Sequence, residues 1–152
     1  MQTFLPYADM RRSARVLDAR RLGKQRVECL QVLRGLTVAD YGWRHHPAVR
    51  MWRGRLEALG RYTLECCEAW TETGRADTVA TTVTSELADH GITTIRTEAE
   101  LADADALPPW WGEEPVHVSH RSALVRKDPE HYRRFFPDVP DDLPYTWPPG
   151  AA

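Results

Sequence analysis

Residues 9–36 read DMRRSARVLDARRLGKQRVECLQVLRGL, and this stretch decides the fold class. Its apolar side chains recur at the spacing of one helix face, which predicts either one bent helix or two. Asp9 precedes the pattern and is of the type that caps helix N-termini. Gly23 lies in the interior, where glycine costs about 1 kcal/mol relative to alanine, so it marks either a kink or a close approach of backbone or phosphate.

Further helices are expected downstream, separated by long loops. After a loop over residues 37–45, Pro47 suits the first turn of a helix with His46 near its cap, and this helix is predicted to run to about Glu72 and to be closed by Gly74. Residues 77–88 predict a shorter helix, although the β-branched run at 81–84 favours a strand. The remaining predicted helices span residues 97–105, which begin with a capping pattern, residues 116–126 and residues 129–135.

These elements predict an all-α protein, a compact single-domain helical bundle with long loops. A length of 152 residues suits one hydrophobic core, and the 42% hydrophobic and 28% charged shares are those of a soluble globular protein. We expect a helical domain over residues 1–136 and a tail over 137–152. The tail holds five of the eleven prolines, so it is predicted to be extended or poorly ordered.

The sequence gives no indication of a membrane or secretory protein. No apolar run approaches the roughly 18 residues that a membrane helix needs, and Met1–Pro6 lacks the basic start and long apolar run of a secretory signal. We therefore expect a cytoplasmic monomer with no membrane partner. The three cysteines have neither disulfide-scaffold nor zinc-ligand spacing and are expected to be reduced and structural.

Charge is distributed unevenly along the chain. Residues 1–62 carry 13 basic and 5 acidic side chains, a net charge of +8, whereas residues 63–116 carry 2 basic and 12 acidic ones, a net charge of −10. A concentrated arginine surface gains affinity for polyphosphate by releasing condensed counterions, so nucleic acid is the natural partner. The alternative is that the basic block pairs with the acidic block inside the monomer, and the two can coexist.

One carboxylate lies within the basic block. Arg21, Lys24 and Glu28 are three and four residues apart, so a helix places them on one stripe beside Arg20 and Gln25. A carboxylate in a cationic field stays ionised, which suits a group that stabilises positive charge developing on a sugar. The alternative is an ordinary solvated helix face with a Lys24–Glu28 ion pair worth a few tenths of a kcal/mol, roughly.

Two further segments mix aromatic and basic side chains. Residues 41–53, YGWRHHPAVRMWR, could stack on exposed bases while arginines contact phosphate, or could combine core tryptophans with surface arginines. Residues 117–136 also mix basic and aromatic side chains, and the alternative there is a surface helix whose aromatic side chains pack inward. A metal site is not expected, because adjacent histidines seldom bind one ion and no Cys or carboxylate completes the pattern. No nucleophile elbow, phosphate-binding glycine motif or dinucleotide fingerprint is present.

Three blocks together resemble the pyrimidine-dimer DNA glycosylase family, the phage endonuclease V type and its bacterial relatives. The first block is residues 17–28, LDARRLGKQRVE, in which Leu22 and Glu28 match the family's Leu-x5-Glu pattern with its catalytic glutamate. Residues 42–47 resemble the Gly-Tyr-x-x-His-Pro block of the bacterial branch, with Trp43 in place of the tyrosine. Residues 120–132 resemble its late His…Arg-Asp-Pro-x-x-Tyr block, with Lys127 in place of the arginine. The resemblance spans residues 1–136.

The resemblance implies an endonuclease V-like fold and a DNA-repair glycosylase with abasic-site lyase activity on pyrimidine-dimer-like damage. In such an enzyme the terminal amine attacks C1′ of the damaged nucleotide, a Schiff base forms, Glu28 assists, and β-elimination nicks the strand. The family exposes a small residue after methionine removal, whereas this chain has the large Gln2, so the amine of Met1 and that of Gln2 are both candidates.

The expected partner is double-stranded DNA with a damaged base, bound in the cytoplasm at the nucleoid, and no cofactor is expected. Trp43, Trp110 and Trp111 are candidates for lesion recognition. Two alternatives stay open: a noncatalytic DNA-binding module, and a helical protein-interaction domain that uses the acidic middle. The side chains expected to bind DNA are Arg20, Arg21, Lys24, Arg26, Arg44, His46, Arg50, His120 and Arg121.

Overall fold

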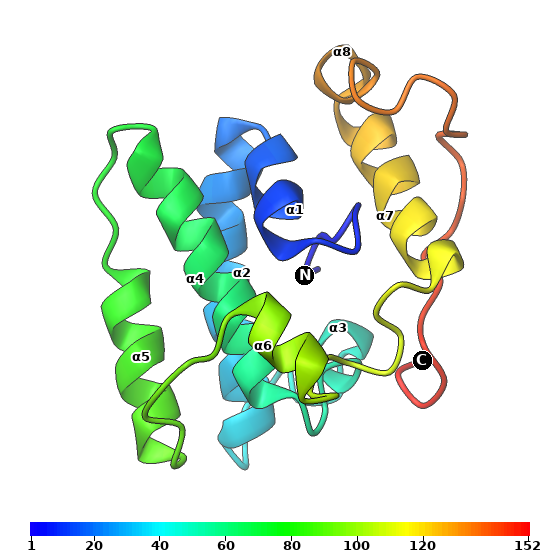
Figure 1. Cartoon of the computed structure of the whole chain (residues 1–152). Helices are drawn as coiled ribbons and strands as arrows, with labels where there is room; N and C mark the ends of the chain where they lie inside the picture. Colours follow the sequence, from blue (N-terminus) through cyan, green and yellow to red (C-terminus); the bar gives the residue numbers. More distant parts are fainter.

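The computed structural model describes all of residues 1–152, and its regular elements are all α-helices, as predicted (Figure 1). They are joined into one domain by long loops, and a single buried apolar cluster draws on residues from Phe4 to Ala151. The helices are α1 (Met10–Val16), α2 (Ala19–Thr37), α3 (Pro47–Arg50), α4 (Leu56–Glu72), α5 (Val79–Asp89), α6 (Glu98–Asp103), α7 (Glu114–Lys127) and α8 (Pro129–Tyr132).

The stretch over residues 9–36 forms two helices rather than one bent helix. Asp9 caps α1, accepting a hydrogen bond from the Arg12 backbone N–H at 2.8 Å, as predicted. Asp18 adopts an extended backbone and caps α2 by accepting from the Arg21 N–H. The second cap therefore separates the two helices.

Gly23 allows a close approach between α2 and α4. A Cβ atom at this position would lie 2.9 Å from the indole ring of Trp70. Such a distance is closer than carbon atoms in contact normally approach. The glycine thus makes room for an aromatic ring from the neighbouring helix rather than for a phosphate.

The prediction of one helix from Pro47 to Glu72 is wrong. His46 does cap α3, its Nδ1 accepting from the Ala48 N–H at 3.0 Å, and Pro47 occupies the first turn. The helix ends at Arg50, however, and Gly54, whose φ of +73° is left-handed, keeps the turn over residues 51–54 from continuing as a helix into α4. The bend between α3 and α4 lets Trp52 enter the core, where its side chain is fully buried.

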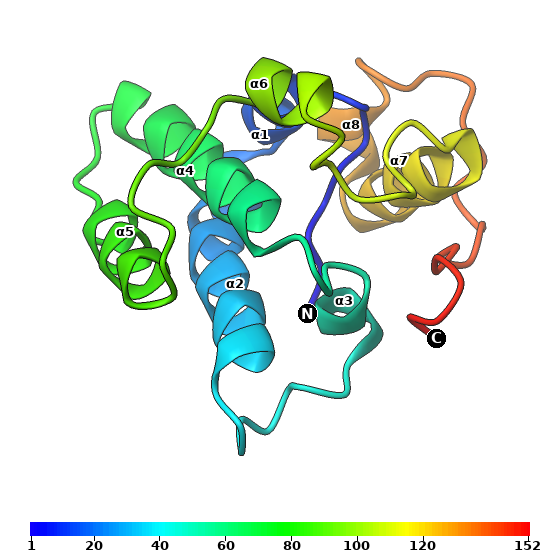
Figure 2. The same ribbon diagram turned by 60° about the horizontal axis from the view of Figure 1, so that its bottom comes forward.

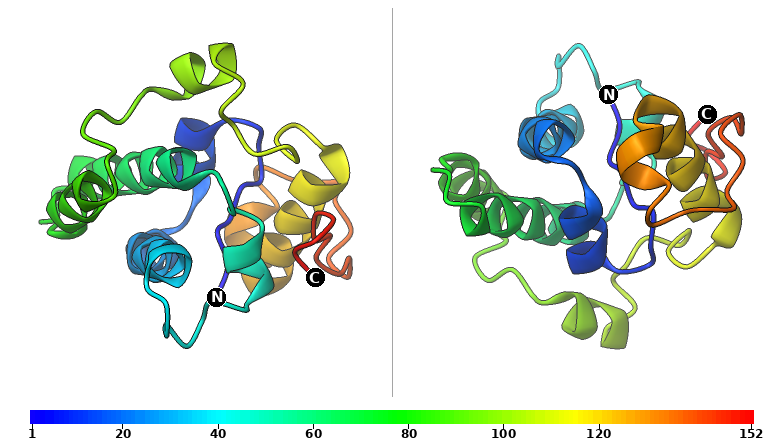
Figure 3. Two further views of the ribbon diagram at one scale, coloured as in Figure 1. Left: turned by 90° about the horizontal axis from the view of Figure 1, so that it is seen from below. Right: turned by 90° about the horizontal axis from the view of Figure 1, so that it is seen from above.

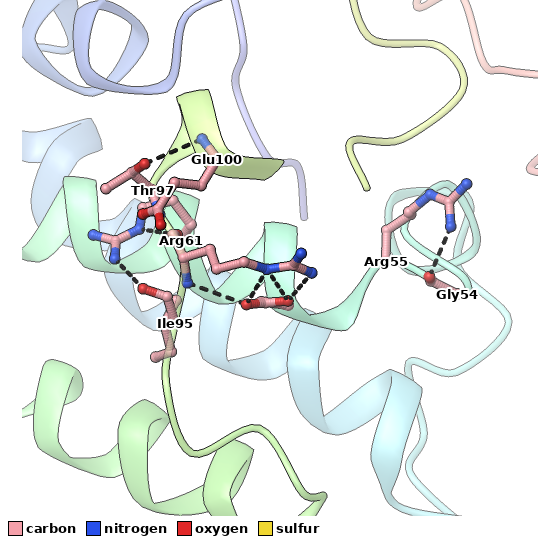
Figure 4. A network of polar contacts seen from close by, with 8 residues as sticks. Gly54, Arg55, Arg61, Ile95, Thr97 and Glu100 are labelled. Atoms are coloured by element: carbon pink, nitrogen blue, oxygen red, sulfur yellow. Dashed lines mark hydrogen bonds and ion pairs between the residues drawn. The ribbon is translucent and has the colours of Figure 1, made fainter. Parts of the chain in front are cut away.

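The later helices follow the predictions with shifted ends. Residues 79–89 form α5, so the threonine run is helical. The predicted capping box at Thr97 and Glu100 is present, but α6 ends before Asp105, which has a φ of 53° (Figure 4). Helix α8 stops at Tyr132 instead of continuing to Phe135.

Arg61 on α4 fixes the connection between α5 and α6. Its guanidinium donates to the Ile95 carbonyl at 2.6 Å and to the Arg96 carbonyl at 2.8 Å (Figure 4). The guanidinium of Arg96 in turn pairs with Glu57 at 2.7 Å. These contacts hold the long connection against the start of α4.

The extended N-terminal segment, residues 1–6, lies between two groups of helices. Helices α1, α2, α4 and α5 pack on one side and α7 with α8 on the other (Figures 1 and 2). The Phe4 N–H donates to Gln25 on α2 at 2.8 Å, and the Phe4 carbonyl accepts from the Tyr62 hydroxyl on α4. On the other side, the Leu5 N–H donates to Nδ1 of His120 on α7 at 2.9 Å. The start of the chain is therefore a core element.

The tail over residues 137–152 is extended and is held to α7 by hydrogen bonds, although most of its residues are exposed. It runs along α7 and ends near α3 (Figure 3). The Leu143 N–H donates to the Ser122 hydroxyl at 3.0 Å, and the Thr146 N–H donates to the Ser119 hydroxyl at 3.1 Å. Arg126 adds a hydrogen bond to the Asp141 carbonyl at 2.8 Å. Of the two predicted states, extended and poorly ordered, the structure shows the extended one.

All three cysteines are free and buried, in agreement with a structural role. None of the helices has both the length and the apolar character that crossing a bilayer requires.

Candidate active site

The first residues of the chain, the N-terminal half of α2 and the C-terminal segment meet around one pocket. Its volume is about 390 Å³, within the roughly 300–1,000 Å³ range of ligand sites. It brings together all three predicted catalytic residues and three of the predicted DNA-binding residues. The lining residues are Met1, Gln2, Phe4, Arg20, Arg21, Lys24, Gln25, Glu28, Lys127 and Tyr145.

Glu28 lies at the inner side of the pocket with each carboxylate oxygen engaged. Its Oε2 accepts from the backbone N–H of Gln2 at 3.4 Å, and its Oε1 lies 3.5 Å from Nζ of Lys24. The side chain of Glu28 is 13% exposed, whereas that of Lys24 is 73% exposed. The ion pair considered as an alternative is thus present, but Glu28 also contacts the start of the chain, which an ordinary solvated helix face would not do.

Gln2 is buried and its backbone groups are hydrogen-bonded, while Met1 is partly exposed. The Gln2 carbonyl accepts from Nε2 of Gln25 at 2.8 Å, and its side-chain Oε1 accepts from the Thr3 N–H at 2.9 Å. Gln2 is only 3% exposed, but Met1 is partly exposed and lines the pocket. Met1, which carries the α-amine of the chain as given, therefore lines the pocket as a partly exposed residue.

Gln25 is the support of this arrangement. It is 1% exposed, and its amide both donates to the Gln2 carbonyl and accepts from the Phe4 N–H. One side chain thus satisfies two buried backbone groups of the extended segment, groups that would otherwise be costly to bury. The terminal residues keep their place opposite Glu28 because of this contact.

His46 lies near the same groups at the start of α3. Burial lowers the pKa of His46, the positive terminal amine lowers it further, and the charge of Glu28 opposes both effects. The His46 ring makes edge contacts with Trp43, at 5.8 Å between centroids, and with Trp147, at 6.3 Å. Together these effects favour the neutral form of the His46 imidazole.

The N-terminal part of the chain matches a known protein family. The sequence model of the family described as pyrimidine dimer DNA glycosylase matches residues 1–83, more than half of the chain. The chain belongs to the pyrimidine dimer DNA glycosylase family. Searches of curated proteins and of solved structures found no match. Family membership points to DNA repair as the role and to DNA as the substrate of this glycosylase.

The residues matched by the family model include only some of those that line the pocket. It includes the terminal residues and the stripe from Arg20 to Glu28 but ends within α5, so Lys127 and Tyr145 lie outside it. Sequence reasoning placed Gln25 beside the stripe without a role and gave no role to Tyr145. A polar residue on the buried face of α2 was a signal for Gln25, whereas nothing in the proline-rich tail indicated that Tyr145 returns to the pocket.

Not every predicted DNA-binding residue of this glycosylase faces the pocket. Arg26 pairs with Asp77, the two side chains being 12% and 3% exposed, and its guanidinium stacks on the Trp70 ring. His120 is fully buried, and burial lowers its pKa to about 3. Arg121 donates to the Pro6 carbonyl at 2.7 Å. These three residues hold the fold, and His120 and Arg26 are not available to DNA without opening the core.

The remaining predicted DNA-binding residues are at the surface. Arg20 is exposed, and Arg21 pairs with Asp18 at 3.2 Å while still lining the pocket. Arg44 is exposed and donates to the Ala39 carbonyl, and Arg50 donates to the carbonyl of Ala152 at 3.4 Å. Arg20, Arg21 and Lys24 thus form a basic rim beside Glu28.

The basic and acidic blocks of the glycosylase also pair with each other, as the alternative interpretation required. Ion pairs join Arg15 to Glu72 at 2.6 Å and Arg34 to Glu86 at 2.9 Å, tying α1 and α2 to α4 and α5. Other basic groups, including Arg20 at the pocket, remain outside these pairs. The internal pairing is therefore present, and it leaves basic groups at the pocket outside it.

The structure contains no cluster of three or more His, Cys, Asp or Glu side chains placed to hold a metal ion. His117 and His120 instead bind the two backbone groups of Leu5. Trp110 is likewise a core residue, 3% exposed, while Trp43 is 48% exposed.

Proposed function

We propose that this protein is a DNA glycosylase with abasic-site lyase activity that acts on pyrimidine-dimer-like damage, with the terminal amine of Met1 as nucleophile and Glu28 as the assisting carboxylate. The observation that carries the proposal is the pocket in which the start of the chain meets Glu28, with Gln2 N 3.4 Å from Oε2. An α-amine suits the task, because its reference pKa of about 7.7–8.0 leaves part of it neutral at cellular pH.

In the first step the amine lone pair forms a bond to C1′ of the damaged nucleotide. The glycosidic bond breaks, and its electron pair leaves with the base, which takes up a proton. Positive charge develops on the sugar in this step. Glu28, whose side chain is only partly solvated, stabilises that charge and accepts a proton from the attacking amine.

In the second step the C1′–O4′ bond opens, O4′ takes up a proton, and the nitrogen and C1′ form a Schiff base. Removal of a proton from C2′ then lets the C3′–O bond break, and the 3′ phosphate leaves with the electron pair. Water hydrolyses the remaining imine and returns the free amine. Glu28 is the pocket carboxylate that can carry these protons.

The basic rim supports binding of the strand. Arg20, Arg21 and Lys24 present positive charge at the edge of the pocket, and phosphate contacts of this kind position a duplex without reading its sequence.

The test uses duplexes carrying a single pyrimidine dimer or a single abasic site. We expect the unmodified protein to cleave both and to form a covalent adduct when borohydride is present. Glu28→Gln is expected to slow both reactions by about 10²–10⁴-fold, the usual contribution of general acid–base catalysis. An extra residue before Met1 moves the amine and is expected to abolish the adduct while leaving salt-sensitive DNA binding.

Binding without any strand cleavage by the unmodified protein would contradict the proposal and would instead support the noncatalytic DNA-binding module. If neither DNA binding nor cleavage occurs, an interaction domain becomes the better account.

A further inference from the structure

The C-terminal segment contributes one wall of the pocket. Tyr145 lines the same 390 Å³ space as Met1 and Glu28, although it lies at the far end of the sequence and outside the family match. A residue that reaches an active site from outside the family's matched region is a candidate for substrate selection rather than for the shared chemistry.

Tyr145 is rigidly supported. The backbone hydrogen bonds of its neighbours, from Leu143 to Ser122 and from Thr146 to Ser119, flank it on both sides. Its ring makes an edge contact with His120 at 5.8 Å between centroids and a tilted contact with Trp147 at 5.5 Å. A side chain fixed in this way loses little entropy when a ligand binds against it.

The side chains of Tyr145 and Gln2 line the same pocket, and the Gln2 amide has a donor without a regular partner. Nε2 of Gln2 is buried and makes no regular hydrogen bond, although Gln2 is only 3% exposed and lines the pocket. Burial raises the pKa of Tyr145, and the charge of Arg126 and the side chain of Gln2 lower it in part. The phenol therefore stays protonated at neutral pH, so that its O–H is available as a donor.

We propose that Tyr145, supported by the Gln2 amide, is the specificity-determining residue that receives the pyrimidine base, its ring packing against the base and its hydroxyl donating to a carbonyl oxygen of the base. This inference rests on the proposed function. A pyrimidine in a dimer keeps its ring carbonyls, and negative charge builds up on the departing base as the glycosidic bond breaks. A positioned donor favours that transition state more than the ground state.

The proposal separates two substrates that share everything except the base. A dimer-containing duplex presents a base to Tyr145, whereas an abasic duplex presents only the sugar and phosphates. We expect Tyr145→Phe, which removes only the hydroxyl, to slow base excision by about tenfold or more while abasic-strand cleavage stays within about twofold of the unmodified protein.

Tyr7→Phe is the matched control, because Tyr7 packs against Phe136 outside the pocket and is expected to change neither rate. Unchanged excision by Tyr145→Phe, or an equal loss on both substrates, would overturn the proposal, the latter by showing a merely structural role. Failure of the unmodified protein to cleave either duplex would instead overturn the proposed function, and this inference with it.

Discussion

The backbone nitrogen of Gln2 lies 3.4 Å from Oε2 of Glu28, a residue 26 positions later in the chain. This contact fixes the start of an extended segment against the middle of a helix. It places the terminal amine and a partly buried carboxylate in one basic pocket.

Gln25 maintains this geometry, so its loss should harm both stability and activity. Gln25→Leu leaves the Phe4 N–H and the Gln2 carbonyl buried without partners, which is expected to lower the free energy of unfolding by about 1–3 kcal/mol. Chemical denaturation measures this loss. The borohydride adduct should decrease at temperatures where the variant is still folded, and full adduct formation by the folded variant would show that the contact does not position the amine.

Substitution of Arg20 is expected to weaken DNA binding, whereas substitution of Arg26 is expected to lower protein stability. Arg20→Gln removes an exposed charge at the pocket and should weaken binding to undamaged duplex, reducing the salt slope of the binding constant by about 1. Arg26→Met leaves Asp77 buried without its partner and should cost about 3 kcal/mol of stability. Titrations at several salt concentrations, done below the melting temperature, should show an unchanged slope for Arg26→Met. A reduced slope for that variant would mean that Arg26 reaches phosphate.

His120 gives the protein a predictable acid sensitivity. Burial lowers its pKa to about 3, whereas a free histidine titrates near 6.5, so the unfolded chain binds the proton first as pH falls. The stability that the neutral, buried His120 contributes to the folded protein is fully present above pH 6.5. Below pH 6.5 the free energy of unfolding decreases by up to about 1.4 kcal/mol per pH unit. His120→Asn keeps an acceptor for the Leu5 N–H but cannot titrate. Unfolding free energies between pH 5 and 7, roughly, should vary less in this variant, and an identical pH dependence would contradict the assignment.

Gly60 should not tolerate a methyl group. A Cβ atom there would overlap the side chain of Leu87, which is fully buried and has no room to move. Overpacking of this kind costs about 1–3 kcal/mol, more than the roughly 1 kcal/mol that alanine gains over glycine in a helix. Gly60→Ala should therefore lower the melting temperature. Gly42→Ala, at a site with nothing within 4 Å, is the control and should be close to neutral.

Local sequence signals predicted most of the helices. The cap residues Asp9, His46 and Thr97 bond backbone groups only two or three positions away. Their positions in the sequence therefore predicted these helix starts. The break at Gly54 was missed because a glycine tolerates a helix interior as well as a positive φ. Only the packing of Trp52 into the core distinguishes a break at Gly54 from a continuous helix.

The candidate site was predicted to the extent that it lies on one helix. Arg20, Lys24 and Glu28 share a stripe whose spacing is visible in the sequence, and the resemblance suggested that the terminus joins them. Tyr145 and the burial of His120 depend on contacts between segments more than a hundred residues apart. Such contacts leave no local pattern, since either residue would suit an exposed position equally well.

The most direct test of the terminal amine as nucleophile is the position of the borohydride-trapped adduct. The protein is incubated with an abasic duplex and borohydride, digested, and analysed by mass spectrometry. The account predicts that the sugar remnant is carried by the α-amine of the N-terminal peptide, Met1–Arg11. The chain has only two lysines, Lys24 and Lys127, and both line the pocket. If a lysine rather than the α-amine were the nucleophile, the adduct would appear on one of these two residues. An adduct on either lysine, or no adduct at all, would contradict the account.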